Sequence, residues 1–324
     1  MKKSNLSFLD IDKLPSSVSE SIKDEIRIAN LHGYDLTRIA KRFLSDPERI
    51  YCIRKLVISG SVELEDKLLT SYDTDILRIL VKYTELHMDF RVILSRYTTK
   101  DHRLLVEKDT LTKLMLGYLS NPDIFKYDFL DIKPDLVSTF IYAVKSKVDV
   151  LDLQKYSLNH PSDVVKLLVN LRVAGIPIQG FLTGDWKTSQ IYALISGSSI
   201  VAPEILIEQY DVDETFPEGS IKEIIRAYEI NPELAMLVAS KDEEGIPIYN
   251  QYQMYEVTEG IRLHLDVSSY YQPTLTDLEM RLKREELIRK EEKRSGKMFK
   301  ERLLSKSTIQ LDDEQLNNIV AHSN

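Results

Sequence analysis

One stretch shows most clearly the pattern that decides the fold: Gln253-Met254-Tyr255-Glu256-Val257-Thr258-Glu259-Gly260-Ile261-Arg262-Leu263-His264-Leu265-Asp266-Val267-Ser268-Ser269-Tyr270. Its pattern predicts one helix, a short polar break and the start of a second helix. Within the stretch, Gly260 and Asp266 are interpreted as turn residues and not as ligands of a site. The stretch is therefore understood as a joint between two helical units.

Weaker copies of this pattern run through most of the chain. Each copy has a small or acidic turn, a short apolar helix, a polar break with Asp, Asn or Pro, and a longer amphipathic helix. The predicted copies cover residues 33–60, 61–87, 88–120, 121–147, 148–175, 176–198, 199–230 and 231–264. Such a period is typical of a helical solenoid, because units too small to bury their own apolar face must stack on their neighbours.

We therefore predict an all-α fold, namely a right-handed, solenoid-like stack of short helical hairpin repeats with a charged C-terminal helix. The predicted divisions are a lead-in and capping helix over residues 1–32, a repeat array over 33–273, and a charged helix and tail over 274–324. We expect the charged helix to project past the stack. The alternative is an irregular helical domain, since amphipathic helices joined by polar turns resemble one another by chance. No stretch shows sustained strict alternation, so we expect little β structure.

The composition is that of a soluble, folded protein, with 43% hydrophobic and 29% charged residues and only 11 Gly and 11 Pro in 324 residues. The single cysteine, Cys52, excludes an intramolecular disulfide and a Cys-based zinc site, and it fits a reducing compartment. No apolar run approaches the roughly 18 residues of a membrane span, and the N-terminus lacks the apolar run of a signal peptide. We therefore expect a cytoplasmic protein without a membrane partner.

The net charge of −8 is distributed unevenly. Residues 281–306 hold eleven Lys and Arg against five Glu, so this segment is basic and the rest of the chain is strongly acidic. An acidic body is a poor partner for nucleic acid, but the basic segment offers a local contact with nucleic acid or with an acidic protein. The alternative is a solvated helix whose Glu and basic residues pair at i,i+4 spacing. The candidate contact residues are Arg281, Lys283, Arg284, Arg289, Lys290, Lys293, Arg294, Lys297 and Lys300.

No motif predicts catalysis, a cofactor or a metal. The segment Gly180–Ser189 lacks the Gly-Lys pair of a phosphate-binding loop, and the acidic runs Asp211–Glu218 and Asp242–Glu244 lack the spacing of a calcium loop. The six histidines form no His-x-x-x-His pair. Three of them precede a predicted turn, where a His can satisfy the free carbonyls at a helix C-terminus: His32, His87 and His264. We predict no cofactor, no metal and no enzymatic activity, and the alternative is an enzyme whose catalytic residues assemble without a local motif.

The stretch Gln253–Tyr270 also resembles a repeat of a known protein family. It is similar to a short α-helical repeat in proteins of Firmicutes phages, plasmids and conjugative elements. The residues that carry the similarity are Gln253-Met254, Glu256-Val257, Gly260-Ile261, Leu265-Asp266-Val267-Ser268, Tyr270 and Pro273. In that repeat, a Gln-Met-x-Glu-Ile helix with Gly-Leu near its end is followed by Gly-Leu-Asp-Val-Ser-x-Tyr-Ala and a Pro. The chain departs from it at His264, where a turn residue such as Gly is usual, and at Tyr271, where Ala is usual. The resemblance implies helical repeats and a mobile-element setting, and it supplies no catalytic residue.

A stack of helical pairs presents an extended concave surface, which is suited to binding another macromolecule. We therefore expect a macromolecular-interaction module of a phage or mobile genetic element. It is expected to bind a protein partner through the repeat surface, as a regulator or inhibitor of a host or competitor protein. The alternative is a DNA- or RNA-binding regulator that uses the basic C-terminal helix. The sequence does not identify the partner.

Overall fold

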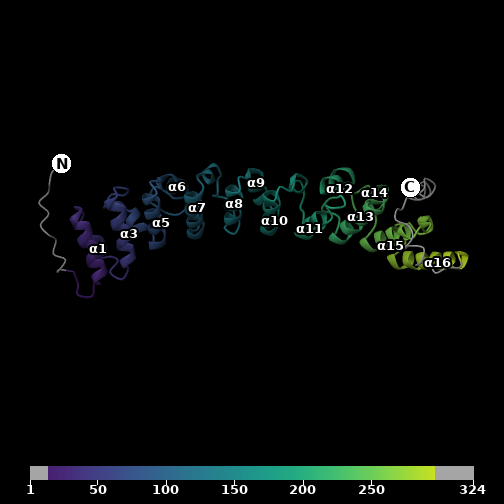
Figure 1. Ribbon diagram of the computed structural model, residues 1–324, viewed down its shortest axis with the longest axis horizontal. Helices are drawn as coiled ribbons and strands as arrows, with labels where there is room; N and C mark the ends of the chain where they lie inside the picture. The colour runs from purple at the N-terminus through teal and green to yellow at the C-terminus, as the bar shows by residue number, and fades with distance from the viewer. Residues whose placement is uncertain (1–13, 296–324) are drawn as a thin grey trace. The chain divides into compact units, whose positions relative to one another are not determined.

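The computed structural model describes residues 14–295 and shows an all-α protein (Figure 1). Within the described residues the β structure amounts to two isolated antiparallel bridges, Thr98–Leu104 and Lys241–Pro247. The chain divides into two compact units, residues 1–173 (unit 1) and 174–324 (unit 2). This boundary falls inside the array predicted over 33–273, so it does not coincide with the predicted divisions.

Short and long helices alternate along both units. Unit 1 contains α1 (Glu20–Leu31), α2 (Thr37–Ala40), α3 (Pro47–Ile58), α4 (Leu68–Ser71), α5 (Thr74–Glu85), α6 (Arg91–Tyr97), α7 (Lys108–Ser120), the 3-10 helix η2 (Pro122–Lys126), α8 (Val137–Lys145), α9 (Leu151–Ser157) and α10 (Ser162–Val173). Unit 2 contains η3 (Gln179–Leu182), α11 (Thr188–Ser196), α12 (Pro203–Gln209), α13 (Glu218–Ile230), α14 (Pro232–Val238), α15 (Gln251–Arg262), η4 (Val267–Ser269) and α16 (Asp277–Ser295).

In each unit the long helices pack in chain order. In unit 1, α1 packs on α3, α3 on α5, α5 on α7, α7 on α8 and α8 on α10 (Figure 1). In unit 2, α11 packs on α13, α13 on α15 and α15 on α16. The contacts are made by fully buried aliphatic side chains such as Ile53, Leu80 and Ile224. Burying one such side chain stabilises the fold by about 1.5–3 kcal/mol, so the packing of neighbours supplies the core that no single helix could form.

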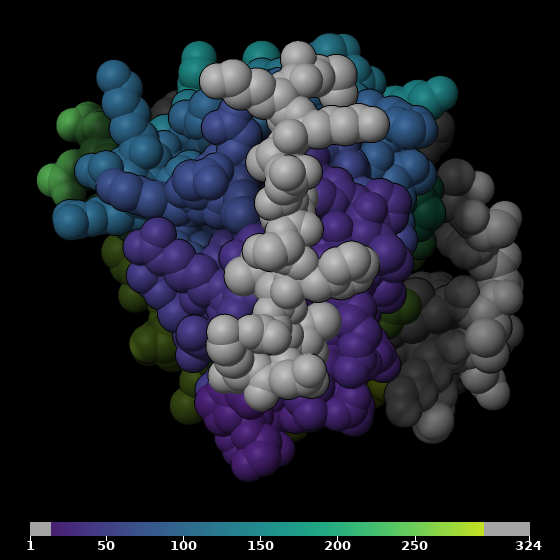
Figure 2. All heavy atoms as spheres, turned by 90° about the vertical axis from the view of Figure 1, so that its left-hand side faces the viewer, coloured from purple at the N-terminus to yellow at the C-terminus, as the bar shows by residue number. Residues whose placement is uncertain are grey.

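The outer side of the first helix is polar. Ile22, Ile26 and Ala29 are buried, whereas ion pairs join Lys23 to Glu20 and Arg27 to Asp24 on the exposed side of α1. Figure 2 turns the molecule so that this end of unit 1 faces the reader, with the atoms of the first helices in purple. The buried residues of α1 and its ion pairs thus lie on different faces, as expected for an amphipathic helix.

The same turn follows most of the long helices. The second residue beyond the helix has a positive φ in six cases: Gly33, Gly60, His87, Lys147, Gly175 and His264. At α5, for example, the His87 N–H donates to the Thr84 carbonyl and the Met88 N–H to the Tyr83 carbonyl. These two hydrogen bonds form a Schellman motif, which satisfies carbonyls that the helix end leaves free. The left-handed residues at 60, 87, 147, 175 and 264 lie at five of the predicted copy ends.

An aspartate then starts the next short helix. The carboxylates of Asp35, Asp89, Asp149 and Asp266 each accept a hydrogen bond from the N–H two residues later. This local bond mimics a backbone turn and redirects the chain at small entropic cost. The prediction that Asp266 is a turn residue is therefore confirmed.

A second kind of joint follows α7 and α13. Both helices have 13 residues and end at an Asn-Pro pair, Asn121-Pro122 and Asn231-Pro232. Each asparagine is extended, and its side chain accepts from the N–H two residues later. The proline occupies the first position of the following helix, where its missing N–H costs nothing.

Two expectations from the sequence are wrong. Gly260 lies inside α15 and is not a turn residue; the left-handed position belongs to His264. In addition, α16 does not project freely, since it packs on α15 through the fully buried Met280. Leu287 and Ile288 of α16 pack against Leu263 and Leu265. The sequence showed the charged side chains of α16 but not the partner helix on which its apolar side chains lie.

Candidate interaction surfaces

The predicted contact residues of the basic segment do not share one environment. Arg284 faces the protein, because its guanidinium donates to Glu256 of α15 at 2.6 Å and its side chain is only 13% exposed. The Lys283 ammonium donates to the carbonyl of Ser269 at 3.2 Å. Lys297 and Lys300 lie outside the described residues. The sequence could not reveal the position of Arg284, because its partner lies 28 residues earlier in the chain.

The remaining basic residues of α16 pair mostly with glutamates on the same helix. Ion pairs join Arg281 to Glu285 at 3.2 Å, Lys290 to Glu286 at 2.8 Å and Arg294 to Glu291 at 3.5 Å, and Arg289 lies 4.0 Å from Glu285. Exposed pairs of this kind contribute little to stability, because water and salt screen them. Residues 277–295 hold seven basic and six acidic side chains. The arrangement is that of a solvated, nearly neutral helix, and contact with a partner through it stays a prediction.

The sequence reasoning missed a set of polar side chains at the third position of the long helices. In α15, the amide of Gln253 accepts from the Asn250 N–H at 2.9 Å and donates to the carbonyls of Pro273 and Leu275 at 3.3 and 2.6 Å. Gln190 in α11 donates likewise to the carbonyls of Glu214 and Phe216. In α3, Arg49 donates to the carbonyls of Leu69 and Tyr72.

These third residues tie α3, α11 and α15 to the segment that precedes the next long helix. Gln253 is 6% exposed and Gln190 is 3% exposed, so their hydrogen bonds form away from water. Burial without such partners would cost about 1–3 kcal/mol per polar group. One signal in the sequence points to Gln253, namely its spacing of three residues from Asn250, which is the spacing of a capping box.

In six long helices, α3, α5, α10, α11, α13 and α15, the fifth residue points the other way, into solvent, whereas the fifth residue of α8, Ile141, is buried. Two residues along a helix correspond to a rotation of about 200°, so the third and fifth positions lie on nearly opposite sides. The fifth positions include three exposed tyrosines, Tyr51 of α3, Tyr192 of α11 and Tyr255 of α15, at 38%, 60% and 39% exposure. Basic side chains occupy the fifth position of α5, α10 and α13: Arg78, Lys166 and Lys222. We call these six residues the fifth-position row.

The row is best ordered in unit 2, where α13 lies between α11 and α15. The Arg226 guanidinium of α13 lies 5.0 Å from the ring centre of Tyr255 and also pairs with Glu259 of α15. Arg262 donates to the same carboxylate, and these bonds, with that of Arg262 the stronger influence, hold the pKa of Glu259 below its ordinary value. The charge of Arg226 is thus fixed against the ring of Tyr255, an arrangement that orders both side chains.

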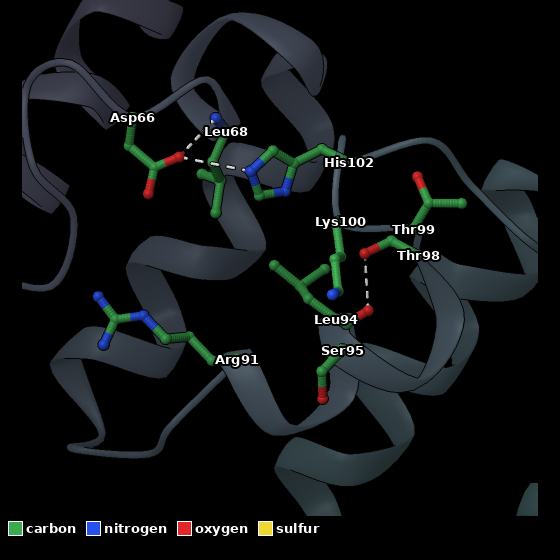
Figure 3. Close-up of a pocket in the computed structure, with 9 residues that line it drawn as sticks. All are labelled: Asp66, Leu68, Arg91, Leu94, Ser95, Thr98, Thr99, Lys100 and His102. Atoms are coloured by element: carbon green, nitrogen blue, oxygen red, sulfur yellow. Dashed lines mark hydrogen bonds and ion pairs between the residues drawn. The ribbon is translucent and has the colours of Figure 1, made fainter.

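A pocket of about 370 Å³ lies beside His102 in unit 1 (Figure 3). It is lined by side chains of both charges together with hydroxyl groups, and Figure 3 labels all nine of them. His102 is left-handed, with a φ of 60°, and its ring nitrogen lies 3.5 Å from the carboxylate of Asp66. Its ring also meets the ring of Tyr72 edge to face at 5.8 Å. These contacts hold the bridged loop Thr98–Leu104 against the residues that flank α4, Asp66 and Tyr72.

The polar groups of this pocket are engaged within the protein. Ser95 and Thr98 donate their hydroxyl protons to the carbonyls of Val92 and Leu94, at 3.0 and 2.7 Å. The Arg91 guanidinium donates to the carbonyl of Ser61 at 2.6 Å. A nucleophile needs its proton directed to a base, and Ser95 and Thr98 direct theirs to the backbone. The pocket therefore has the geometry of a stabilised turn.

The described part of the chain contains neither a metal-binding cluster nor a reactive thiol. No group of three or more His, Cys, Asp or Glu side chains there is placed to hold a metal ion. Cys52 is buried in α3, and this burial raises the pKa of its thiol to about 11. The thiol is therefore protonated near neutral pH and unreactive. Among residues 14–295, none of the helices combines the length and apolar character that a membrane crossing requires.

Comparison with protein-family models, with curated proteins and with solved structures gives no match to this chain. The class that the described residues define is an all-α protein whose long helices pack in chain order within each of two units.

Proposed function

We propose that the chain is a macromolecular-interaction module of a phage or other mobile genetic element. In this proposal it acts in the cytoplasm and binds a protein partner through the fifth-position row, as a regulator or inhibitor of a host or competitor protein. The observation that carries the proposal is the row itself, in which Tyr and basic residues occupy the fifth position of six long helices, including the three successive helices α11, α13 and α15 of unit 2.

The proposal includes a solenoid-like stack of helical hairpin repeats. Its support is the recurrence of one joint, a Schellman turn followed by an aspartate, together with the packing of each long helix on the next within a unit. Five of the long helices, α1, α3, α5, α10 and α15, also have the same length of 12 residues. In such a stack equivalent positions of neighbouring long helices line up, so Tyr192, Lys222 and Tyr255 would form one surface on α11, α13 and α15 of unit 2.

The composition of the row favours a protein partner. Tyr, Trp and Arg are enriched among the side chains that carry most of the free energy of protein association. A tyrosine adds a large contact area with few rotatable bonds, and its hydroxyl keeps it compatible with solvent before binding. The charge of the chain also disfavours nucleic acid, since residues 174–280 hold eighteen Asp and Glu against five Lys and Arg.

The test compares capture of proteins from a bacterial lysate by three full-length forms. These are the wild type, the double variant Tyr192→Ala/Tyr255→Ala, and the control Tyr142→Ala. Tyr142 is 52% exposed on α8 but lies outside the row. We expect a partner that the wild type and the control capture and the double variant loses. Equal capture by all three forms, or no specific capture, would contradict the proposal.

The alternative function, a DNA- or RNA-binding regulator, rests on the basic surplus of residues 281–306. It predicts binding of the full-length chain to duplex DNA that weakens steeply between about 50 and about 200 mM salt. Deletion of residues 296–324 should abolish this binding and leave α16 in place on α15. Absence of salt-sensitive binding in the full-length chain would remove this alternative.

A further inference from the structure

We propose that a groove in unit 2 binds an extended, basic segment of the partner protein. This inference rests on the proposed function and specifies the chemistry of the partner. The groove has a volume of about 740 Å³ and lies where three pieces of the chain meet. These are the first turn of α13, the first turn of α15, and the bridged loop that carries Ile246.

Every side chain that lines the groove is uncharged. Ile246 and Tyr252 are 53% and 60% exposed, and the exposed Pro217 contributes further apolar surface. Exposed apolar and aromatic groups around a hollow can bury alternate side chains of an extended peptide. A free charged small molecule would find no counter-charge inside the groove, whereas a peptide backbone needs none.

The groove also offers polar groups for the main chain of a peptide. The N-cap of α13 is Pro217, which supplies no side-chain acceptor for the first turn, whereas Asn250 caps α15 and accepts from two N–H groups. Ser220 is 1% exposed, lines the groove, and its hydroxyl has no hydrogen-bond partner. An unpaired buried hydroxyl is costly and gains most from a ligand that satisfies it. A peptide carbonyl that accepts from these donors would satisfy both needs.

Ser220 occupies the third position of α13, where α11 and α15 carry Gln190 and Gln253. Those two glutamines reach the carbonyls of the following loop, which a serine side chain is too short to do. Unlike α11 and α15, the long helices that pack on either side of it, α13 therefore lacks this tie. The groove lies at this position.

The surroundings of the groove select a basic segment. Asp242, Glu243 and Glu244 are exposed in the same loop as Ile246. Of the five basic residues among 174–280, four are held in ion pairs with acidic side chains: Lys222, Arg226, Lys241 and Arg262. The remaining acidic excess attracts Lys and Arg side chains, raises the rate of encounter with a basic partner and repels an acidic one.

The experiment selects binders from a display library of short random peptides on the full-length wild-type protein. The affinity of the most enriched peptide is then measured by fluorescence anisotropy. We expect enriched peptides to carry a net positive charge and apolar residues at alternate positions. The variant Tyr252→Ala should weaken binding about tenfold. Ser220→Ala should weaken it less, and Glu243→Gln/Glu244→Gln should reduce its dependence on salt.

The matched control is Tyr192→Ala, because Tyr192 is also 60% exposed but lies outside the groove. It should leave peptide binding unchanged. Enrichment of acidic peptides, no enrichment, or equal loss in Tyr192→Ala would overturn the inference. The two proposals fail separately. A lysate partner that is lost from the Tyr192→Ala/Tyr255→Ala variant and kept by Tyr252→Ala supports the row and rejects the groove.

Discussion

The turns that follow α1 and α15 have the same geometry and use glycine in opposite places. After α1, the Gly33 N–H donates to the carbonyl of Asn30 and the Tyr34 N–H to that of Ala29. After α15, the His264 and Leu265 N–H groups donate to the carbonyls of Ile261 and Gly260 in the same pattern. Glycine therefore stands at the left-handed turn position in the first joint, but four residues earlier, inside the helix, in the second.

The difference lies in what packs on the helix. A Cβ atom on Gly260 would lie 1.8 Å from the Tyr270 hydroxyl oxygen and 2.7 Å from a methyl carbon of Val267. At the turn of α1, a Cβ atom on Gly33 would meet nothing within 4 Å. The first glycine is thus needed for its backbone conformation and the second for the close approach of a side chain. A glycine in a sequence can serve either role, a left-handed turn or the close approach of a side chain. Only the residues packed around it in the structure distinguish the two roles.

The largest effect is expected for Gly260→Ala. Tyr270 is fully buried, and its hydroxyl donates to the Glu256 carbonyl, so the ring cannot move aside without breaking contacts. We expect the free energy of unfolding, measured by urea denaturation, to fall by about 3 kcal/mol. At the equivalent position of α1, Ala29→Gly should cost only about 1 kcal/mol through helix propensity.

A second variant keeps this prediction testable if the chain folds poorly. Changing Tyr270→Phe removes the atom nearest to the added Cβ, so Gly260→Ala/Tyr270→Phe should regain part of the lost stability. If Gly260→Ala is neutral or stabilising, Gly260 is not placed by the approach of Tyr270.

The sequence was sufficient for what depends on neighbours along the chain. The alternation of short and long helices, the ends of five copies and the turn role of Asp266 all follow from local patterns of apolar, acidic and small residues. It was insufficient where the partner lies far along the chain. Arg284 looked like a free basic residue until Glu256 appeared beside it, and Gly260 looked like a turn residue until Tyr270 appeared over it.

The candidate surfaces divide in the same way. The tyrosines of the fifth-position row are visible in the sequence but become a row only when the helix starts are known to the residue. The groove near Ser220 depends on a missing contact with a following loop, which no local pattern can show. Periodicity therefore predicts the helices and their turns, and the surfaces between them require the packed structure.

A middle-sized effect is expected at the third position, where α1 has the buried Ile22 and α15 has Gln253. Gln253→Ala removes one hydrogen bond from the Asn250 N–H and leaves the carbonyls of Pro273 and Leu275 without their donor. We expect a loss of about 2 kcal/mol in urea denaturation. The neighbouring change Tyr252→Ala, at an exposed position, should alter stability by no more than about 0.5 kcal/mol. Equal losses in the two variants would show that Gln253 contributes only its apolar contacts.

The smallest effect is expected at the turn position itself, and its sign differs between the two joints. His264 has a φ of 56°, a conformation that a residue with a Cβ adopts at a cost, so His264→Gly should stabilise the protein by about 1 kcal/mol. Gly33 has a φ of 86° and open space around it, so Gly33→Ala should destabilise by about the same amount through the backbone. Thermal unfolding of both variants against the wild type measures the two shifts. If both variants lower the unfolding temperature, the side chain of His264 makes contacts that stabilise the protein by more than its backbone strain costs. The two turns would then depend on different interactions, and not only on different residues.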